Sequence, residues 1–254
     1  MLAIMRKWLL QILAGAAIVL LYGNCSKSSE SAAQTGAGGS TARFTISGNY
    51  LYVVDHSSLK TFSIANPENP VLKSKTEIGI NIETIFPYQD KLFIGSSFSM
   101  YIFSLTSPER PVQIAKADYE IRMACDPVVA KDGVAYATLR ASGPCGGSQS
   151  ALVVYNTTDI SKPVLAKTVN LQGPYGLGLK DNALYVCEGA LGIRVFDIAD
   201  KYNPVQVSTL EHDETYYDVI PYGNILIAQA ASGIVLYDTG ADPLQPVFIS
   251  KITQ

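Results

Sequence analysis

Charged residues and histidines are scarce in this 254-residue chain. Only 16% of the residues are charged, the net charge is −3 and no run of basic residues occurs, which excludes the electrostatic footprint of a nucleic-acid-binding protein. The two histidines, His56 and His212, lie in different parts of the chain, and neither has a G-x-S-x-G motif or a cysteine cluster beside it. The sequence therefore predicts no catalytic residue, no metal site and no cofactor.

Long apolar runs are also missing. The longest covers 15 residues, from Trp8 to Tyr22, behind Arg6 and Lys7. At about 1.5 Å per residue it is short for a bilayer core of ~30 Å, but it suits a signal peptide. Residues 26–40 contain almost no large apolar side chains, and we expect them to form a flexible linker.

The segment "LLYGNCSKSSES" resembles a bacterial lipoprotein signal, with a cysteine directly after the apolar run. The resemblance implies cleavage before Cys25 and lipidation of Cys25, so that residues 1–25 form the signal region. An ordinary secretory signal cleaved near Gly23 is the alternative. Either interpretation places the mature protein outside the cytoplasm. The lipoprotein interpretation places it at the outer membrane or cell surface, in contact with the membrane only through its lipid.

A fivefold repeat organises residues 41–254. Each copy contains an apolar run, then an aromatic residue followed by Asp, Asn or Ser, and ends in Pro-Val. The period is 41 or 42 residues, apart from one interval of 52 that contains the segment "RASGPCGGSQS". The aromatic positions are Phe62, Phe103, Tyr155, Phe196 and Tyr237, and the prolines are Pro70, Pro111, Pro163, Pro204 and Pro246.

Each repeat predicts four short antiparallel strands. The segments are four to seven residues long and are separated by turn residues such as "SGN", "KDG" and "YGN", with connections too short for crossover helices. Four-stranded units of this length are blades of a β-propeller, and five are enough to close a ring. An open β-solenoid is the alternative. The short polar residue after each aromatic is expected to bond the backbone of the next turn rather than a ligand.

The segments "LYVVDHSSLKTFSIANPENPV" and "LYVCEGALGIRVFDIADKYNPV" resemble the LVIVD repeat, a propeller-type repeat of bacterial lipoproteins. The resemblance covers roughly residues 41–254 and is looser in the first two copies, where Ser63 and Ser104 replace the acidic residue. It implies an all-β, five-bladed β-propeller outside the cytoplasm. It implies no particular activity.

Strand alternation predicts which loops share one side of the ring. Loops that precede the first strand and loops that follow the second strand of each repeat should lie together, and we call this the recognition side. Its candidate binding residues combine acids, tyrosines, one arginine and one histidine. They are His56, Glu83, Asp126, Arg140, Tyr175, Glu188, Tyr217 and Asp218. The alternative is that such residues are ordinary rim side chains, with Asp126 pairing with Arg140.

Three cysteines remain beyond Cys25. Cys125 precedes a first strand and Cys145 lies in the long loop after the second strand of the same repeat. Because neighbouring strands lie about 4.8 Å apart, a Cys125–Cys145 disulfide is geometrically natural, and the resemblance to Cys-containing LVIVD blades extends to these residues. Cys187 is expected to be a small buried side chain; its pairing with Cys125 is the alternative. A reactive thiol pair lacks a neighbouring histidine.

These observations favour a binding or scaffolding module for a protein or glycan partner. A propeller enzyme, such as a lyase or hydrolase acting on a polysaccharide through acidic and tyrosine side chains, is the alternative. A purely structural surface protein is a third. A deep pocket with several converging carboxylates and tyrosines would favour the enzyme, and a shallow surface would favour binding.

Overall fold

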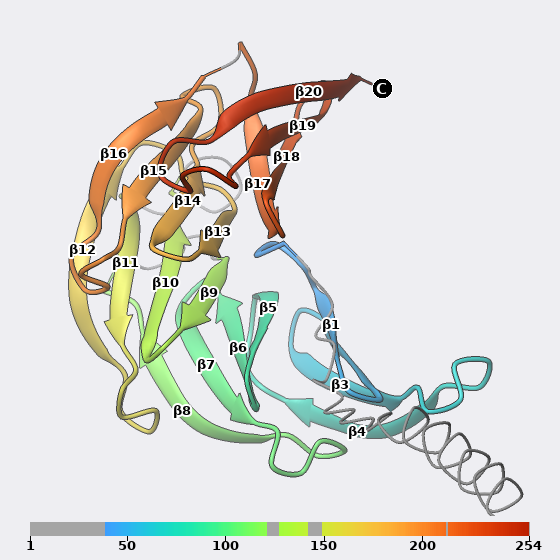
Figure 1. Ribbon diagram of the computed structural model, residues 1–254. Coiled ribbons are helices and arrows are strands. Elements are labelled where there is room, and N and C mark those ends of the chain that lie inside the picture. Colours follow the sequence, from blue (N-terminus) through green and yellow to red (C-terminus); the bar gives the residue numbers. More distant parts are fainter. Residues whose placement is uncertain (1–38, 121–126, 142–148, 212, 254) are drawn as a thin grey trace, which may run out of the picture. The chain divides into compact units, whose positions relative to one another are not determined.

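The computed structural model describes residues 39–120, 127–141, 149–211 and 213–253 (Figure 1). The described chain forms twenty β-strands. No helix among these residues is long and apolar enough to span a membrane. The strands are β1 (Phe44–Ser47), β2 (Tyr50–Val54), β3 (Ser58–Ser63), β4 (Val71–Glu77), β5 (Ile82–Tyr88), β6 (Lys91–Ser96), β7 (Ser99–Ser104), β8 (Val112–Asp118), β9 (Val128–Lys131), β10 (Val134–Leu139), β11 (Ser150–Asn156), β12 (Val164–Leu171), β13 (Leu177–Lys180), β14 (Ala183–Cys187), β15 (Ile193–Asp197), β16 (Val205–Leu210), β17 (Tyr216–Tyr222), β18 (Ile225–Ala230), β19 (Gly233–Asp238) and β20 (Val247–Thr253).

Each repeat is one antiparallel sheet of four consecutive strands, so the chain has five blades. The first strands of neighbouring blades contact one another in the order β1, β5, β9, β13, β17, which arranges the blades side by side around a common centre (Figure 1). This confirms the five-bladed propeller expected from the repeat. Blade 1 is β1–β4, and the following blades continue in groups of four strands.

The first hairpin of every blade turns through a residue with positive φ. Blades 1 and 5 use Gly48 (58°) and Gly223 (55°), where the absence of a Cβ makes this conformation accessible. Asp132 and Asp181 hold the same place in blades 3 and 4, and Asp tolerates the left-handed region because its short side chain can bond locally. The turn residues of the sequence thus set the hairpin registers.

The aromatic and polar residues at the end of each third strand recur in all five repeats, and they mark a shared feature of the strand pairing. A register shift between the third and fourth strands occurs directly before the aromatic residue in all five blades. The polar residue that follows then accepts a hydrogen bond from the backbone N–H two residues on. The donor–acceptor pairs are Thr106–Ser104 (3.3 Å), Thr158–Asn156 (2.9 Å), Ala199–Asp197 (2.9 Å) and Gly240–Asp238 (2.7 Å). The prediction of turn chemistry is confirmed in these blades.

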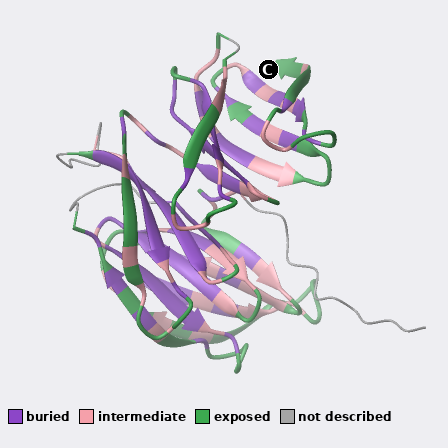
Figure 2. Ribbon diagram, turned by 60° about the vertical axis from the view of Figure 1, so that its left-hand side comes forward, coloured by how far each residue is buried: buried purple, intermediate pink, exposed green. Residues whose placement is uncertain are grey.

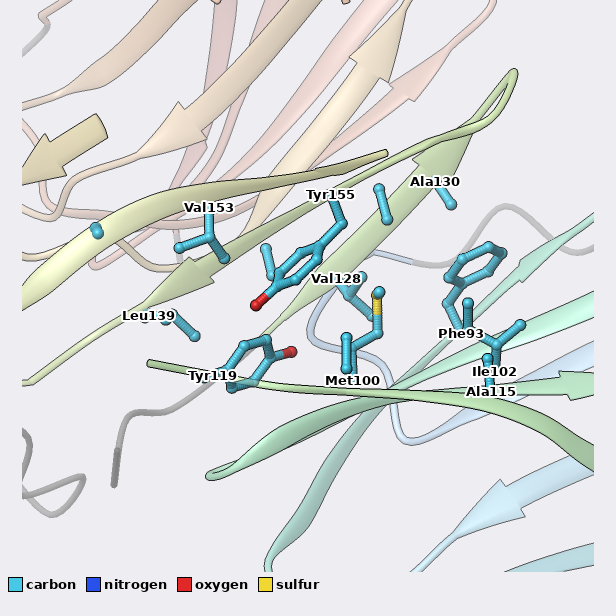
Figure 3. Close-up of a cluster of buried hydrophobic side chains, with 14 residues drawn as sticks. Phe93, Met100, Ile102, Ala115, Tyr119, Val128, Ala130, Leu139, Val153 and Tyr155 are labelled. Atoms are coloured by element: carbon cyan, nitrogen blue, oxygen red, sulfur yellow. The ribbon is translucent and has the colours of Figure 1, made fainter. Parts of the chain in front are cut away.

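The core lies between blades rather than within one. Each blade has a leading face, which packs on the preceding blade, and a trailing face, which packs on the following blade. Four buried clusters occupy the four junctions between consecutive blades. In Figure 3, Met100 and Ile102 on the trailing face of blade 2 lie near Val128 and Tyr155 on the leading face of blade 3. Burial is consequently greatest in the middle strands, while the outer strands are largely exposed (Figure 2).

Buried tyrosines tie consecutive blades together. Tyr52, Tyr136 and Tyr185 occupy the same position on the trailing face of blades 1, 3 and 4, and none has an exposed side chain. Their hydroxyls donate to backbone carbonyls in the next blade, between its third and fourth strands. The acceptors are Pro108 (3.0 Å), Lys201 (2.6 Å) and Pro243 (2.6 Å). Burial raises the pKa of all three phenols, so they remain donors at any physiological pH.

Closure between the last and first blades is not formed in the described chain. Phe44, on the leading face of blade 1, is 62% exposed, and Figure 1 shows β1 and β17 at the two ends of the row of first strands. Five blades are enough in number to close a ring, but among the described residues blades 1 and 5 do not pack on each other as consecutive blades do. The blade-to-blade angle set by the packed side chains leaves blades 1 and 5 apart.

Candidate functional site

Three partly exposed side chains from three blades form a stack on the recognition side. Arg140 follows β10, Tyr175 precedes β13 and Tyr217 lies near the start of β17. The Arg140 guanidinium carbon is 4.2 Å from the centroid of the Tyr175 ring. The Tyr175 and Tyr217 ring centroids are 5.3 Å apart, with an interplanar angle of 75°. A cation over an aromatic face and an edge-to-face ring pair are both favourable contacts.

Backbone hydrogen bonds between blades hold this stack in place. The Thr138 hydroxyl donates to the Tyr175 carbonyl (2.5 Å), which ties blade 3 to the segment before β13. The Tyr175 N–H donates to the carbonyl of Cys187 (2.8 Å), and the Gly176 N–H donates to that of Tyr217 (2.8 Å). The backbone that carries the two tyrosine rings is therefore fixed by neighbouring blades. A ligand that binds there would not have to bear the entropy cost of ordering this backbone.

A glycine backbone packs closely against the ring of Tyr175, the central residue of the stack. Gly189 has a φ of +60°, and a Cβ placed there would lie 3.2 Å from Cε2 of Tyr175. The lack of a side chain lets the loop after β14 pass close under the ring. We name the surface of Arg140, Tyr175 and Tyr217 the Arg-Tyr platform. Its three side chains are partly exposed, and they combine two aromatic rings with one guanidinium group.

A pocket of about 410 Å³ adjoins the platform on blade 5. Tyr217 and Asp218 line its end nearest the platform, and Gln229 and three isoleucines on the trailing face of blade 5 line the rest. The pocket thus combines a polar rim with an apolar floor. Among the described residues, no group of three His, Cys, Asp or Glu side chains is placed to hold a metal ion.

Glu188, predicted as a binding residue, is an internal ion-pair partner instead. Its side chain is 0% exposed and pairs with Arg194, whose side chain is 23% exposed. The backbone N–H groups of Gln172 and Gly173 also donate to the Glu188 carboxylate. The Glu188 carboxylate is therefore directed inward and bonds the loop before Tyr175, and its contact with a partner stays a prediction.

Asp218, another predicted binding residue, is likewise turned into the protein. It is 6% exposed. Its carboxylate accepts hydrogen bonds from the hydroxyls of Ser40 (3.1 Å) and Thr41 (2.6 Å) and from the N–H of Val219 (2.9 Å). A Cβ on Gly39 would lie 2.0 Å from Oδ2, so only glycine allows this approach.

These contacts fasten the chain before β1 to blade 5. Ser40 is 2% exposed, and its hydroxyl also accepts the N–H of Leu177 (2.8 Å) in blade 4. Ser40 therefore belongs to the propeller and not to the flexible linker assigned to residues 26–40. No sequence signal indicates that Ser40, at the end of a Gly/Ser-rich segment, has this role. Its partner Asp218 lies 178 positions away.

Replacing Asp218 by asparagine should remove a pH dependence of stability. Burial raises the pKa of the Asp218 carboxyl, so the native state holds its proton to higher pH than the unfolded state. Stability from this group is present below the ordinary value of about 3.9 and falls as the pH rises through the raised native pKa. We expect the free energy of unfolding of wild type to decline relative to Asp218→Asn across this window. Urea unfolding at a series of pH values measures the difference, and parallel curves would contradict the prediction.

Hydrogen bonds within the region of blades 1 and 2 hold Glu83 and His56. The Ser97 hydroxyl donates to Glu83 (2.9 Å), and the exposed His56 contributes its carbonyl as acceptor for Ile82 N–H (3.1 Å). Both belong to the region of blades 1 and 2. The structure therefore brings together three of the predicted residues, which are those of the Arg-Tyr platform.

The remaining predictions fall partly outside the described residues. Cys25, Cys125, Asp126 and Cys145 lie there, so the lipidation and the Cys125–Cys145 disulfide stay predictions. Cys187 is a free, fully buried cysteine, and burial raises the pKa of its thiol. Its expected role as a small buried side chain is confirmed, and the alternative pairing of Cys125 with Cys187 is not formed.

Comparison with known proteins agrees with this fold. The chain resembles the computationally designed protein Ika8 (TM-score 0.61, 12% identity, 82% of this chain and 60% of that chain). It also resembles the periplasmic gluconolactonase PpgL of Pseudomonas aeruginosa (0.64, 14%, 81% and 68%) and BamB from Moraxella catarrhalis (0.56, 9%, 74% and 53%). The chain thus spans about half to two thirds of the length of these structures. No curated protein matches the sequence.

The fold and its neighbours define the protein as a β-propeller. The family model of the LVIVD repeat matches residues 38–77, so this segment is similar to that repeat. This match covers blade 1 together with the segment that bonds Asp218.

Proposed function

We propose that this chain is a binding module outside the cytoplasm, anchored through a lipid on Cys25, and that the Arg-Tyr platform contacts its partner. The observation that supports a binding role is the partly exposed Arg140–Tyr175–Tyr217 stack on a backbone fixed between three blades. Arginine and tyrosine are the residues that most often dominate recognition energies.

A glycan is the partner that best suits the platform. The C–H face of a sugar ring can pack on an aromatic ring as an aliphatic group does, while the guanidinium donates to hydroxyl or carboxylate oxygens. Arg140 brings a guanidinium group beside Tyr175. A protein partner, which the sequence analysis expects equally with a glycan, is the second candidate.

The enzyme alternative receives less support. A polysaccharide hydrolase or lyase needs acids or bases that reach the substrate. Glu188 and Asp218, the predicted acids near the platform, are bonded inside the protein. Similarity to a gluconolactonase at 14% identity concerns the fold and assigns no reaction to this chain.

Alanine substitutions in the platform should weaken glycan binding. We expect Tyr175→Ala or Arg140→Ala to raise the dissociation constant for a bound glycan at least tenfold, because each removes a central contact group. Glycan-array screening of the full chain identifies the ligand, and isothermal titration calorimetry measures the change.

Arg110→Ala is the matched control. Arg110 is an exposed arginine between β7 and β8, in a loop of the opposite side of the ring. We expect it to bind like wild type. Glycan binding that persists unchanged in both platform variants contradicts the proposed site, and binding of proteins alone would replace the glycan by the second candidate.

A further inference from the structure

The leading face of blade 1 lacks the cover that every other leading face has. Phe44 occupies the position of Ile85, Val128, Leu177 and Val219 in the following blades. These four side chains are 0–1% exposed, whereas Phe44 is 62% exposed. The strand pairing places Leu51, Val53 and Phe62 on the same face as Phe44, and all three are partly exposed.

The trailing face of blade 5 is uncovered in the same way. Ile227 occupies the position of Tyr52, Tyr136 and Tyr185, which are fully buried, yet Ile227 is partly exposed. On the outer strand, Ile252 is 59% exposed, while Ala117 at the same place in blade 2 is 6% exposed. The apolar side chains of this face are Ile220, Tyr222, Ile225, Ile227, Ile234, Leu236 and Ile252.

These two faces are the two halves of one type of interface. At each of the four junctions within the chain, a trailing face packs on a leading face and forms a buried cluster. Within the described part of the chain, blade 5 offers a trailing face without a leading partner, and blade 1 offers a leading face without a trailing partner. Large contiguous apolar patches are uncommon on a soluble monomer and mark interaction sites.

We propose that a second copy of this chain packs the leading face of its blade 1 on the trailing face of blade 5. Every copy carries both faces, and the contact continues the interface already formed four times within the chain. The arrangement is head-to-tail, so the two surfaces in contact differ. Such a contact closes into a ring or continues as an open assembly, depending on the rotation between copies.

Aspartate substitutions at exposed positions test this arrangement. Phe44→Asp disables the leading face and Ile252→Asp disables the trailing face. Both side chains are exposed, so neither change removes a core contact. We expect wild type to associate with increasing concentration in sedimentation velocity of the full chain. Each variant alone should associate at least tenfold more weakly, with a predominantly monomeric boundary.

Mixing the variants identifies a head-to-tail contact. Phe44→Asp keeps an intact trailing face and Ile252→Asp an intact leading face, so an equimolar mixture should form dimers and nothing larger. Val112→Asp, at a side chain that is 60% exposed on blade 2, is the matched control and should associate like wild type.

A cross-linking measurement gives an independent test. Chains carrying Phe44→Cys should form disulfide-linked dimers when mixed with chains carrying Ile252→Cys or Ile227→Cys, and not when mixed with Val112→Cys. A wild type that stays monomeric at all concentrations overturns the proposal. This holds if blades 1 and 5 of one chain cover each other, and also if these faces bind a different molecule. Association that the two aspartate variants leave unchanged, or that mixing fails to restore, also overturns it.

Discussion

Tyr185→Ala will lower the free energy of unfolding by about 3–5 kcal/mol, the cost of truncating a large buried aromatic side chain. Tyr185 is 0% exposed and packs in the cluster between blades 4 and 5. Its hydroxyl donates to the Pro243 carbonyl at 2.6 Å. The substitution therefore opens a cavity at a blade junction and removes a bond between blades. Urea unfolding followed by circular dichroism measures the loss.

Two further variants separate these contributions. Tyr185→Phe keeps the ring and removes the bond, and should cost about 1 kcal/mol. Tyr222→Ala truncates a tyrosine that is 65% exposed and should change stability by no more than about 0.5 kcal/mol in dilute solution. A Tyr185→Ala variant no less stable than Tyr222→Ala would contradict the role assigned to the blade junctions.

Arg194→Ala will lower the free energy of unfolding by about 3 kcal/mol. It leaves the fully buried Glu188 carboxylate without its ionic partner, and an uncompensated buried charge is strongly destabilising. The loss stays at the lower end of the usual range because solvent reaches part of Arg194. The backbone N–H groups of Gln172 and Gly173 continue to bond the carboxylate. Thermal and urea unfolding near neutral pH measure the effect.

The double variant Glu188→Gln/Arg194→Met provides the control. It removes both charges and keeps similar volumes, so most of the stability should return. If Arg194→Ala and the double variant are equally destabilised, the unpaired charge of Glu188 is not the cause of the loss. Since Glu188 also bonds the loop before Tyr175, weaker glycan binding in Arg194→Ala would connect the pair to the platform.

The blades could be predicted from the sequence because their determinants are local. Turn residues such as Gly48 and Asp132 sit between apolar runs, and the polar residue after each aromatic bonds a backbone group two positions away. These signals recur five times, so each repeat supports the reading of the others. The burial of Cys187 followed from the same alignment of the repeats.

The acids of the site could not be assigned in this way. Glu188 and Asp218 stand at strand ends where the sequence predicts a rim, and side chains there can face solvent or turn inward. Their direction depends on donors supplied by other elements: Arg194 on β15, and Ser40 and Thr41 far upstream. Tyr175 and Tyr217 were placed correctly on one side of the ring, but their stacking with Arg140 required the relative position of three blades.

The sequence by itself determined the strands, the turns, the number of blades and the side of the ring on which each loop lies. These depend on alternation and turn chemistry within about forty residues. Only the tertiary structure decided that Asp218 fastens the chain before β1, that Arg140 meets Tyr175 and that blades 1 and 5 leave complementary faces uncovered. Each of these outcomes depends on the angle and distance between blades, which arise from side-chain packing at junctions between residues far apart in the chain.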